Sequence, residues 1–198
     1  MTQHRSNSKL IKNRNRCPWC LKDQLYMDYH DEVWGVPERD SRQLWIKLIL
    51  DGQQAGLSWY TILSKMDHYE EAFDGWNIEK IAAYGEDEFR NLMQNPGIVR
   101  NKLKIRSIIG NARAYLDMEE AGENFSAFLW SFVDGKTIVN TPKKMDDVPT
   151  QTSQSQAMSK ALKKKGFKFI GPTICYAFMQ AVGMVDDHLA SCWRKNNI

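Results

Sequence analysis

The 198-residue chain lacks several features that mark other classes of protein. No apolar run reaches the length of a membrane-spanning helix, and the first residues lack the apolar segment of a secretory signal. Few stretches alternate between apolar and polar residues, so strands are expected to be scarce. Only four cysteines are present, and in a reducing compartment they are expected to be thiols or metal ligands rather than disulfides. These absences predict a helical, cytoplasmic protein without a membrane segment.

Net positive charge is also small, at +3, and does not by itself imply a nucleic-acid partner. The length suits one domain with a sizeable core. Residues 1–16 are polar, basic and free of acid, and we predict a disordered tail there. Basic clusters are ordinarily solvated faces, and they contact phosphates only in a suitable structural context. Two further clusters are Arg100, Lys102, Lys104 and Arg106, and Lys163, Lys164, Lys165 and Lys168.

What is present is apolar spacing typical of helices along most of the chain. One helix is predicted to begin at Asp40, where Gln43 can complete a capping box. A long helix is predicted over 101–121, whereas 136–152 is expected to be a surface loop within the domain. Further helices are predicted from Ser58 through Met66, after Asn77, around Phe89 to Met93, from Phe125 to Phe132, from Ala157 to Leu162, and from Pro172.

Residues 50–59 read Leu-Asp-Gly-Gln-Gln-Ala-Gly-Leu-Ser-Trp, and we predict that they connect two helices. Glycines there allow unusual backbone conformations and the close approach of a ligand. The carboxylate of Asp51 and the indole of Trp59 can hold a flat ligand that is positively charged or forms hydrogen bonds. The alternative is an ordinary helix–helix connection with a buried tryptophan.

A second turn, Asn95-Pro96-Gly97, separates two predicted helices and resembles a helix-hairpin-helix DNA-binding element. Pro96 disfavours helix at the residue before it, and Gly97 can adopt a positive φ. Amides at such a turn can bind a phosphate oxygen, and Arg100 and Lys102 flank it. Val99 stands where the usual hairpin has a second glycine. A plain helical turn is the alternative.

Cysteine and histidine occur together near both ends of the chain. His188 and Cys192 are four residues apart and are predicted to share one helical face. Cys17 and His30 can complete a tetrahedral zinc site with them. The alternative is two unrelated thiols and two surface imidazoles. Cys20 is near enough to replace Cys17 as a ligand.

Several blocks of the sequence resemble the DNA-3-methyladenine glycosylase I family of base-excision repair enzymes. One is Tyr-His-Asp-Glu-Val-Trp-Gly-Val-Pro at 29–37, and another is the 50–59 stretch. The resemblance implies an all-α fold in a single helical domain over 17–192, with a helix-hairpin-helix element and residues 193–198 as a tail. It covers nearly the whole span from Cys17 to Cys192, continuing through blocks at 109–115, 164–169, 173–176, 178–181 and 187–188.

The resemblance implies a monofunctional glycosylase that flips 3-methyladenine out of alkylated double-stranded DNA and releases it hydrolytically. Asp51 stands where the best-known relatives have a glutamate that binds the base, and it is one methylene shorter. Leu57, beside Gly56, corresponds to an apolar wedge that fills the gap in the base stack. No lysine is assigned as a nucleophile. The residues that match the family's pocket aromatics are Trp19, Tyr29 and Trp59, with Trp34 and Tyr26 as further candidates.

The resemblance also implies one structural Zn²⁺ held by Cys17, His30, His188 and Cys192, and a monomer. Asp51 is the expected catalytic group. The expected DNA contacts are Gly56, Leu57, Gly97, Arg100 and Lys102. Two other functions stay open. One is a zinc-containing helix-hairpin-helix protein that binds DNA without catalysis, and the other is a glycosylase for a different alkylated base.

Overall fold

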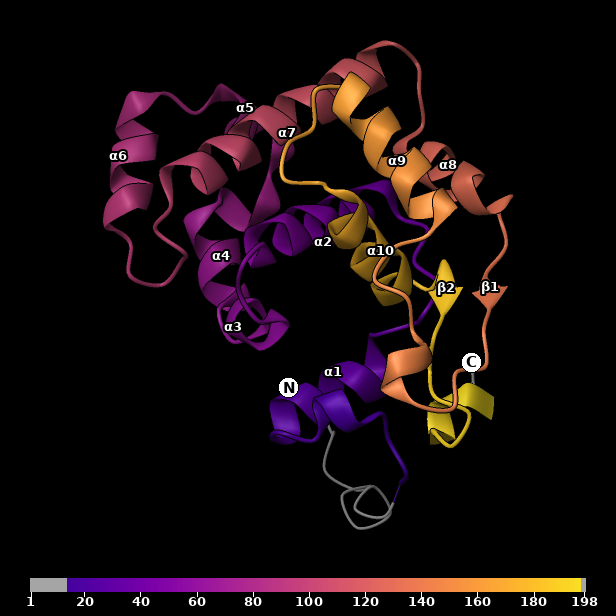
Figure 1. Cartoon of the computed structure of the whole chain (residues 1–198). Helices are drawn as coiled ribbons and strands as arrows, with labels where there is room; N and C mark the ends of the chain where they lie inside the picture. The colour runs from indigo at the N-terminus through magenta and orange to yellow at the C-terminus, as the bar shows by residue number, and fades with distance from the viewer. Residues whose placement is uncertain (1–13, 197–198) are drawn as a thin grey trace, which may run out of the picture.

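The computed structural model describes residues 14–196 and shows a mostly helical molecule (Figure 1). None of the helices in this part of the chain is long and apolar enough to span a membrane. The principal helices are α1 (Gln24–Glu32), α2 (Ser41–Gln54), α3 (Trp59–Leu63), α4 (Met66–Ala72), α5 (Ile78–Ala83), α6 (Glu86–Gln94), α7 (Lys102–Glu120), α8 (Phe125–Trp130), α9 (Ser153–Lys164) and α10 (Pro172–Ala181). Shorter 3-10 turns are η2 (Pro18–Cys20), η3 (Asp74–Trp76), η4 (Ser131–Val133), η5 (Met145–Asp147) and η6 (Trp193–Asn196).

Local capping signals explain where several helices begin. The carboxylate of Asp40 accepts a hydrogen bond of 2.8 Å from the backbone N–H of Gln43 at the start of α2. Asn77 caps α5 in the same way, and Asn101 caps α7. Pro172 is the first residue of α10, where its missing N–H leaves no hydrogen bond unmade. These predicted helix starts are confirmed.

Helix α2 extends further than predicted, because it continues to Gln54 and takes the first half of the 50–59 stretch into its last turn. Gly52 is therefore helical and makes no turn. A Cβ on Gly52 would lie 3.2 Å from the backbone oxygen of Phe169, so glycine there permits the close approach of a later segment. Gly56 does make the turn, with φ of +76°. The predicted single helix from 58 to 66 is likewise two helices, α3 and α4.

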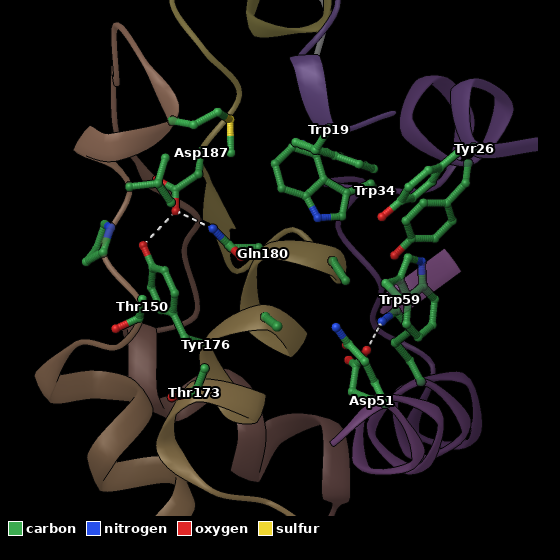
Figure 2. Close-up of a pocket in the computed structure, with 18 residues that line it drawn as sticks. Trp19, Tyr26, Trp34, Asp51, Trp59, Thr150, Thr173, Tyr176, Gln180 and Asp187 are labelled. Atoms are coloured by element: carbon green, nitrogen blue, oxygen red, sulfur yellow. Dashed lines mark hydrogen bonds and ion pairs between the residues drawn. The ribbon is translucent and has the colours of Figure 1, made fainter. Parts of the chain in front are cut away.

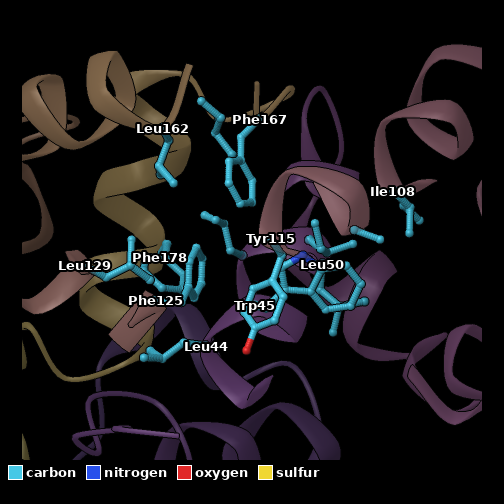
Figure 3. Packing of buried hydrophobic residues seen from close by; sticks show 14 of the residues in the cluster. Leu44, Trp45, Leu50, Ile108, Tyr115, Phe125, Leu129, Leu162, Phe167 and Phe178 are labelled. Carbon is cyan, nitrogen blue, oxygen red and sulfur yellow. The ribbon is translucent and has the colours of Figure 1, made fainter. Parts of the chain in front are cut away.

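The core surrounds α2, which packs against α7, α8 and α10. Trp45 on α2 is fully buried, and its indole N–H donates a hydrogen bond of 3.1 Å to the carbonyl of Asn111 on α7. Figure 3 shows Trp45 beside Tyr115, among residues contributed by later helices. Because these large side chains fill the centre, α2 is held rigidly, and the residues on its last turn have fixed positions.

A lysine fixes the end of α2. Lys104 on α7 is buried, and its ammonium group donates hydrogen bonds of 2.7 Å to the carbonyls of Gln53 and Ala55. Carbonyls at a helix C-terminus lack partners within the helix, and a cation there also interacts favourably with the negative end of the helix dipole. Lys104 thus stabilises the C-terminal turn of α2.

The fold is mostly helical, as predicted, but it also contains two short strands. Strands β1 (Ile138–Val139) and β2 (Val185–Asp186) pair in parallel, with Ile138 opposite Val185. Strands of two residues are too short to produce the alternating pattern by which sequence reveals a strand. The pairing holds the 136–152 segment against the residues that follow α10, so this segment is an integral part of the structure.

The two ends of the described chain lie together beside α1 (Figure 1). Trp193 donates a backbone hydrogen bond of 2.8 Å to Asn15. Arg16 is buried, and its guanidinium pairs with Asp31 at 2.8 Å. Ordered structure therefore extends beyond both ends of the predicted 17–192 domain. Most of the predicted tail at 1–16 lies outside the described residues.

Candidate functional site

A cavity of about 270 Å³ lies between α1, the last turn of α2, α10 and the segment around η5 (Figure 2). Its volume is near the lower end for small-molecule sites, which suits one heterocycle. The structure places all five predicted ligand-binding and catalytic residues around it, together with Tyr26. The lining residues are Trp19, Tyr26, Tyr29, Trp34, Lys47, Asp51, Gln54, Trp59, Met145, Val148, Pro149, Thr150, Thr173, Tyr176, Ala177, Gln180, Ala181 and Asp187.

Aromatic rings form one side of this cavity. The ring centroids of Trp19 and Trp34 are 5.1 Å apart with planes inclined at 70°, an edge-to-face contact. Tyr29 and Trp59 are 5.4 Å apart. Each ring face is electron-rich, so the wall can stack against a planar base and attracts one that carries positive charge.

Asp51 lies below these aromatic rings, on the last turn of α2 (Figure 2), and only 1% of this residue is exposed. Its carboxylate pairs with the ammonium group of Lys47, one helical turn earlier. Burial raises the pKa of Asp51, and the positive charge of Lys47 opposes that rise. The ammonium also lies 3.8 Å from the centre of the Trp59 ring, a cation–π contact. Burial lowers the pKa of Lys47, and Asp51 opposes that fall.

Lys47 was not among the predicted site residues. Its four-residue spacing from Asp51 is a visible signal, because side chains at that separation share one helix face. The signal went unused because residues 50–59 were predicted to form a connection, whereas Asp51 continues the same helix as Lys47.

Two polar atoms at the cavity have no hydrogen-bond partner among residues 14–196: Oδ2 of Asp51 and the indole Nε1 of Trp59. Buried polar groups are nearly always paired, so an unpaired acceptor and an unpaired donor on two residues that line one cavity suggest a ligand. A nucleobase edge offers both donors and acceptors. The arrangement can bind such an edge while the neighbouring rings stack on the base.

The opposite side of the cavity carries a second carboxylate, Asp187, which was not among the predicted site residues (Figure 2). Its Oδ2 accepts hydrogen bonds from the hydroxyl of Tyr176 at 2.6 Å and from the amide of Gln180 at 2.8 Å. Its Oδ1 accepts a hydrogen bond of 2.7 Å from the amide of Asn140. The spacing of Tyr176 and Gln180 on α10 could have indicated a shared face, but no local pattern relates either residue to Asp187.

Three of the four predicted metal ligands form a buried cluster. The ligand atoms of Cys17, His30 and Cys192 all lie within 4.8 Å of one another. The hydrogen bond from Cys17, together with His30, holds the pKa of the Cys192 thiol below its ordinary value. Nδ1 of His30 is 2.8 Å from Asp31, which leaves Nε2 directed at Cys192. The thiol of Cys20 instead donates to the carbonyl of Cys17, so it is not part of the cluster.

His188 lies beside this cluster, and its ring centroid is 5.1 Å from that of His30. The prediction that His188 and Cys192 share a helical face is wrong, because both lie in the non-helical segment that follows β2. Nδ1 of His188 is 2.9 Å from Asp186, and its Nε2 is buried with no partner in the described chain. A Cβ on Gly35 would lie 2.6 Å from Cε1 of this ring, so glycine is required for the ring to fit.

The Asn95-Pro96-Gly97 turn connects α6 and α7, so the prediction that it separates two helices is confirmed. Gly97 is not among the residues with positive φ, contrary to expectation. Glycine is needed there for another reason, because a Cβ would lie 2.9 Å from the Cβ of His68. Arg100 and Lys102 are both exposed after the turn. Leu57, beside Gly56 in the α2–α3 connection, is 41% exposed.

The remaining basic residues of this cluster are occupied within the molecule. Lys104 caps α2, and the guanidinium of Arg106 pairs with Glu86 at 2.9 Å. Only Arg100 and Lys102 of the four are left to face a phosphate. Spacing alone could not separate the two pairs, because burial and partners depend on how the helices pack.

Comparison with known proteins gives consistent matches over most of the chain. A family model described as methyladenine glycosylase matches residues 19–195. DNA-3-methyladenine glycosylase of Haemophilus influenzae is 54% identical over 177 residues, which are 89% of this chain and 96% of that protein. DNA-3-methyladenine glycosylase 1 of Escherichia coli is 52% identical over 177 residues, 89% and 95% of the two chains. A solved structure describing 3-methyladenine recognition by 3-methyladenine DNA glycosylase I from Staphylococcus aureus has a TM-score of 0.88 at 42% identity, and covers 92% of this chain and 97% of that one.

Proposed function

The chain belongs to the methyladenine glycosylase family, and from that premise we propose that it releases 3-methyladenine from alkylated DNA in base-excision repair. The observation that carries this proposal is a cavity with an aromatic side, large enough for one base, lined by two residues, Asp51 and Trp59, that each have a polar atom without a partner in residues 14–196. Methylation at N3 makes the adenine cationic. An aromatic wall with a carboxylate at its base suits a flat cation.

The reaction needs little help for the leaving group, because the methylated base already carries a positive charge. When the bond between C1′ of the sugar and N9 of the base breaks, its electron pair neutralises the base, which leaves as 3-methyladenine. Water then bonds to C1′, and its proton passes to solvent. The protein's tasks are therefore to flip the nucleotide out, bind the base and stabilise charge on the sugar.

The basic turn after α6 and the α2–α3 connection are the proposed DNA contacts. The side chains of Arg100 and Lys102 are exposed after the turn and suit phosphate oxygens. Leu57 is an exposed apolar residue next to Gly56, and it suits insertion into the space that the flipped base vacates. In this proposal α6, the turn and α7 are a helix-hairpin-helix element that binds the DNA backbone. Leu57 then enters the DNA beside the cavity.

A single structural zinc ion is proposed at the cluster of Cys17, His30, His188 and Cys192. Two thiols and two imidazoles are a preferred tetrahedral donor set. Both imidazoles fit ligation, because each holds one nitrogen against a carboxylate and leaves the other directed inward. When bound, zinc would join the first folded residues to the last. Four protein donors leave no position for a catalytic water.

An assay of base release tests the proposed activity. DNA treated with a methylating agent is incubated with the protein, and the free bases are separated and identified. We expect 3-methyladenine well above the spontaneous rate and no strand cleavage without alkali, since Lys47 is held by Asp51. Release of another methylated base in its place would support the alternative substrate. DNA binding without any release would support the non-catalytic alternative.

A further inference from the structure

Two carboxylates line the cavity, and they differ in their partners. Asp51 has an internal counter-ion, because Lys47 pairs with it. Asp187 is 3% exposed and forms no ion pair with any lysine, arginine or histidine of residues 14–196. A buried charge without a counter-ion is costly unless something compensates it.

Three neutral donors surround this carboxylate. Tyr176 and Gln180 come from α10, and Asn140 comes from the segment after β1. Burial and the bond to Asp187 raise the pKa of Tyr176 above its usual range, so its hydroxyl stays a donor. The donors hold the anion in place and leave its charge uncancelled.

The position of Asp187 separates it from the groups that suit the base. Figure 2 shows Asp51 and Trp59 on one side of the cavity and Asp187 with Tyr176 on the other. The sugar is attached in the plane of the base, so a base whose one edge meets Asp51 would carry its sugar at an edge that points across the cavity. The uncompensated anion therefore lies on the side available to the sugar.

Resting on the proposed glycosylase function, we propose that Asp187 faces the deoxyribose and stabilises the positive charge that develops on it as the base leaves. The C1′–N9 electron pair departs with the base, and the sugar carbon and ring oxygen share the positive charge until water bonds to C1′. A fixed anion nearby lowers the energy of that state more than that of the intact nucleotide, which is the condition for catalysis. Asp51 holds the base, and Asp187 serves the sugar.

Binding of two abasic-site analogues tests this division. One duplex carries a pyrrolidine analogue, whose ring nitrogen is protonated, and the other carries an uncharged tetrahydrofuran of the same size. We expect the wild-type protein to bind the pyrrolidine duplex at least about tenfold more tightly, because it resembles the charged state of the sugar. Asp187→Asn should reduce this preference to about twofold or less and leave tetrahydrofuran binding unchanged. The maximal rate of single-turnover release of 3-methyladenine should fall, with little change in the protein concentration that gives half of that rate.

Two further variants make the test decisive. Asp51→Asn should keep the pyrrolidine preference, because that residue faces the base. Asn140→Lys places a cation beside Oδ1 of Asp187 and should abolish the preference with the carboxylate still present. Melting temperature and metal content select the folded variants. The inference would be overturned if folded Asp187→Asn or folded Asn140→Lys kept the wild-type preference for the pyrrolidine duplex. It would also be overturned if Asp51→Asn lost that preference. Failure of the wild-type protein to release 3-methyladenine would instead reject the proposed function.

Discussion

At the scale of single residues, Asp51 has one oxygen paired with Lys47 and one without a partner in the described chain. Asp51→Asn keeps the size of the side chain but removes its charge. We expect single-turnover release of 3-methyladenine to slow by about ten- to a hundredfold, roughly 1.4–2.7 kcal/mol. Asp51→Glu extends the carboxylate toward the cavity and should match or exceed the wild-type rate. Equal rates for Asn and wild type would show that the aromatic rings suffice.

Lys47 gives this carboxylate a pH dependence. Burial raises the pKa of Asp51 and Lys47 opposes the rise, so Lys47→Met should raise it further. The base in DNA is a fixed cation, and activity should fall as pH drops through the pKa of Asp51. The acid limb should therefore lie above the value of about 3.9 for an ordinary aspartate, and higher again in Lys47→Met. Rates of single-turnover release measured across pH give the acid limb of the wild-type protein and that of Lys47→Met.

The stability of the fold should change in the opposite direction over the same window. A carboxyl whose pKa is raised in the folded state stabilises the fold fully below its unfolded pKa, and that contribution is lost as pH rises through the folded value. Tyr29 and Cys175 are also coupled to Asp51, but their pKa values are raised and both titrate at higher pH. An acid limb that does not move in Lys47→Met would show that another group controls it.

At the scale of elements, the site depends on how α2 ends. Lys104→Met removes the two hydrogen bonds to the carbonyls of Gln53 and Ala55 and leaves those carbonyls unpaired. We expect the free energy of unfolding to fall by about 1.5–3 kcal/mol, with weaker binding of the base, since the same turn carries Asp51. Denaturant titration measures the first effect. Arg106→Met is the matched control on the same helix, because its exposed pair with Glu86 should contribute under about 1 kcal/mol.

The turn between α6 and α7 gives a second prediction at this scale. Arg100→Ala and Lys102→Ala should each weaken binding to every duplex sequence alike. Each lost phosphate contact should reduce the slope of log affinity against log salt by about one. Lys80→Ala, an exposed lysine on α5, is the control and should leave the slope unchanged. An unaltered slope in the Arg100/Lys102 double variant would place the DNA elsewhere.

At the scale of the whole molecule, a metal is proposed to join the two ends of the fold. Protein purified without added metal should contain close to one zinc per chain by elemental analysis. Cys192→Ser should lower both occupancy and melting temperature, because the ligand set becomes incomplete. Cys20→Ser should keep full occupancy, since its thiol is directed at the carbonyl of Cys17. Full zinc content in a Cys17→Ser, His188→Ala double variant would reject the site.

Sequence predicted the parts of the fold and site that depend on near neighbours. Asp40, Asn77 and Pro172 mark helix starts because capping is a local interaction. The aromatic side of the cavity was found through resemblance to a family. The Asp187 side was not predicted, because its hydrogen bonds join α10 to the segment after β1. Lys104 was grouped with a basic cluster, whereas its partners are two carbonyls at the end of α2, about fifty residues earlier in the chain. Such contacts follow from packing, which no local pattern shows.

The cavity draws its walls from opposite ends of the chain, and this has a consequence during synthesis. Trp19 and Tyr29 leave the ribosome long before Gln180 and Asp187, which line the same cavity. The α2-centred helices can pack as they emerge, since domains fold progressively during translation. The base site cannot close until α10 and Asp187 have been made. A nascent chain is therefore inert toward DNA bases, and a truncation before α10 removes one wall of the cavity together with two of the proposed metal ligands.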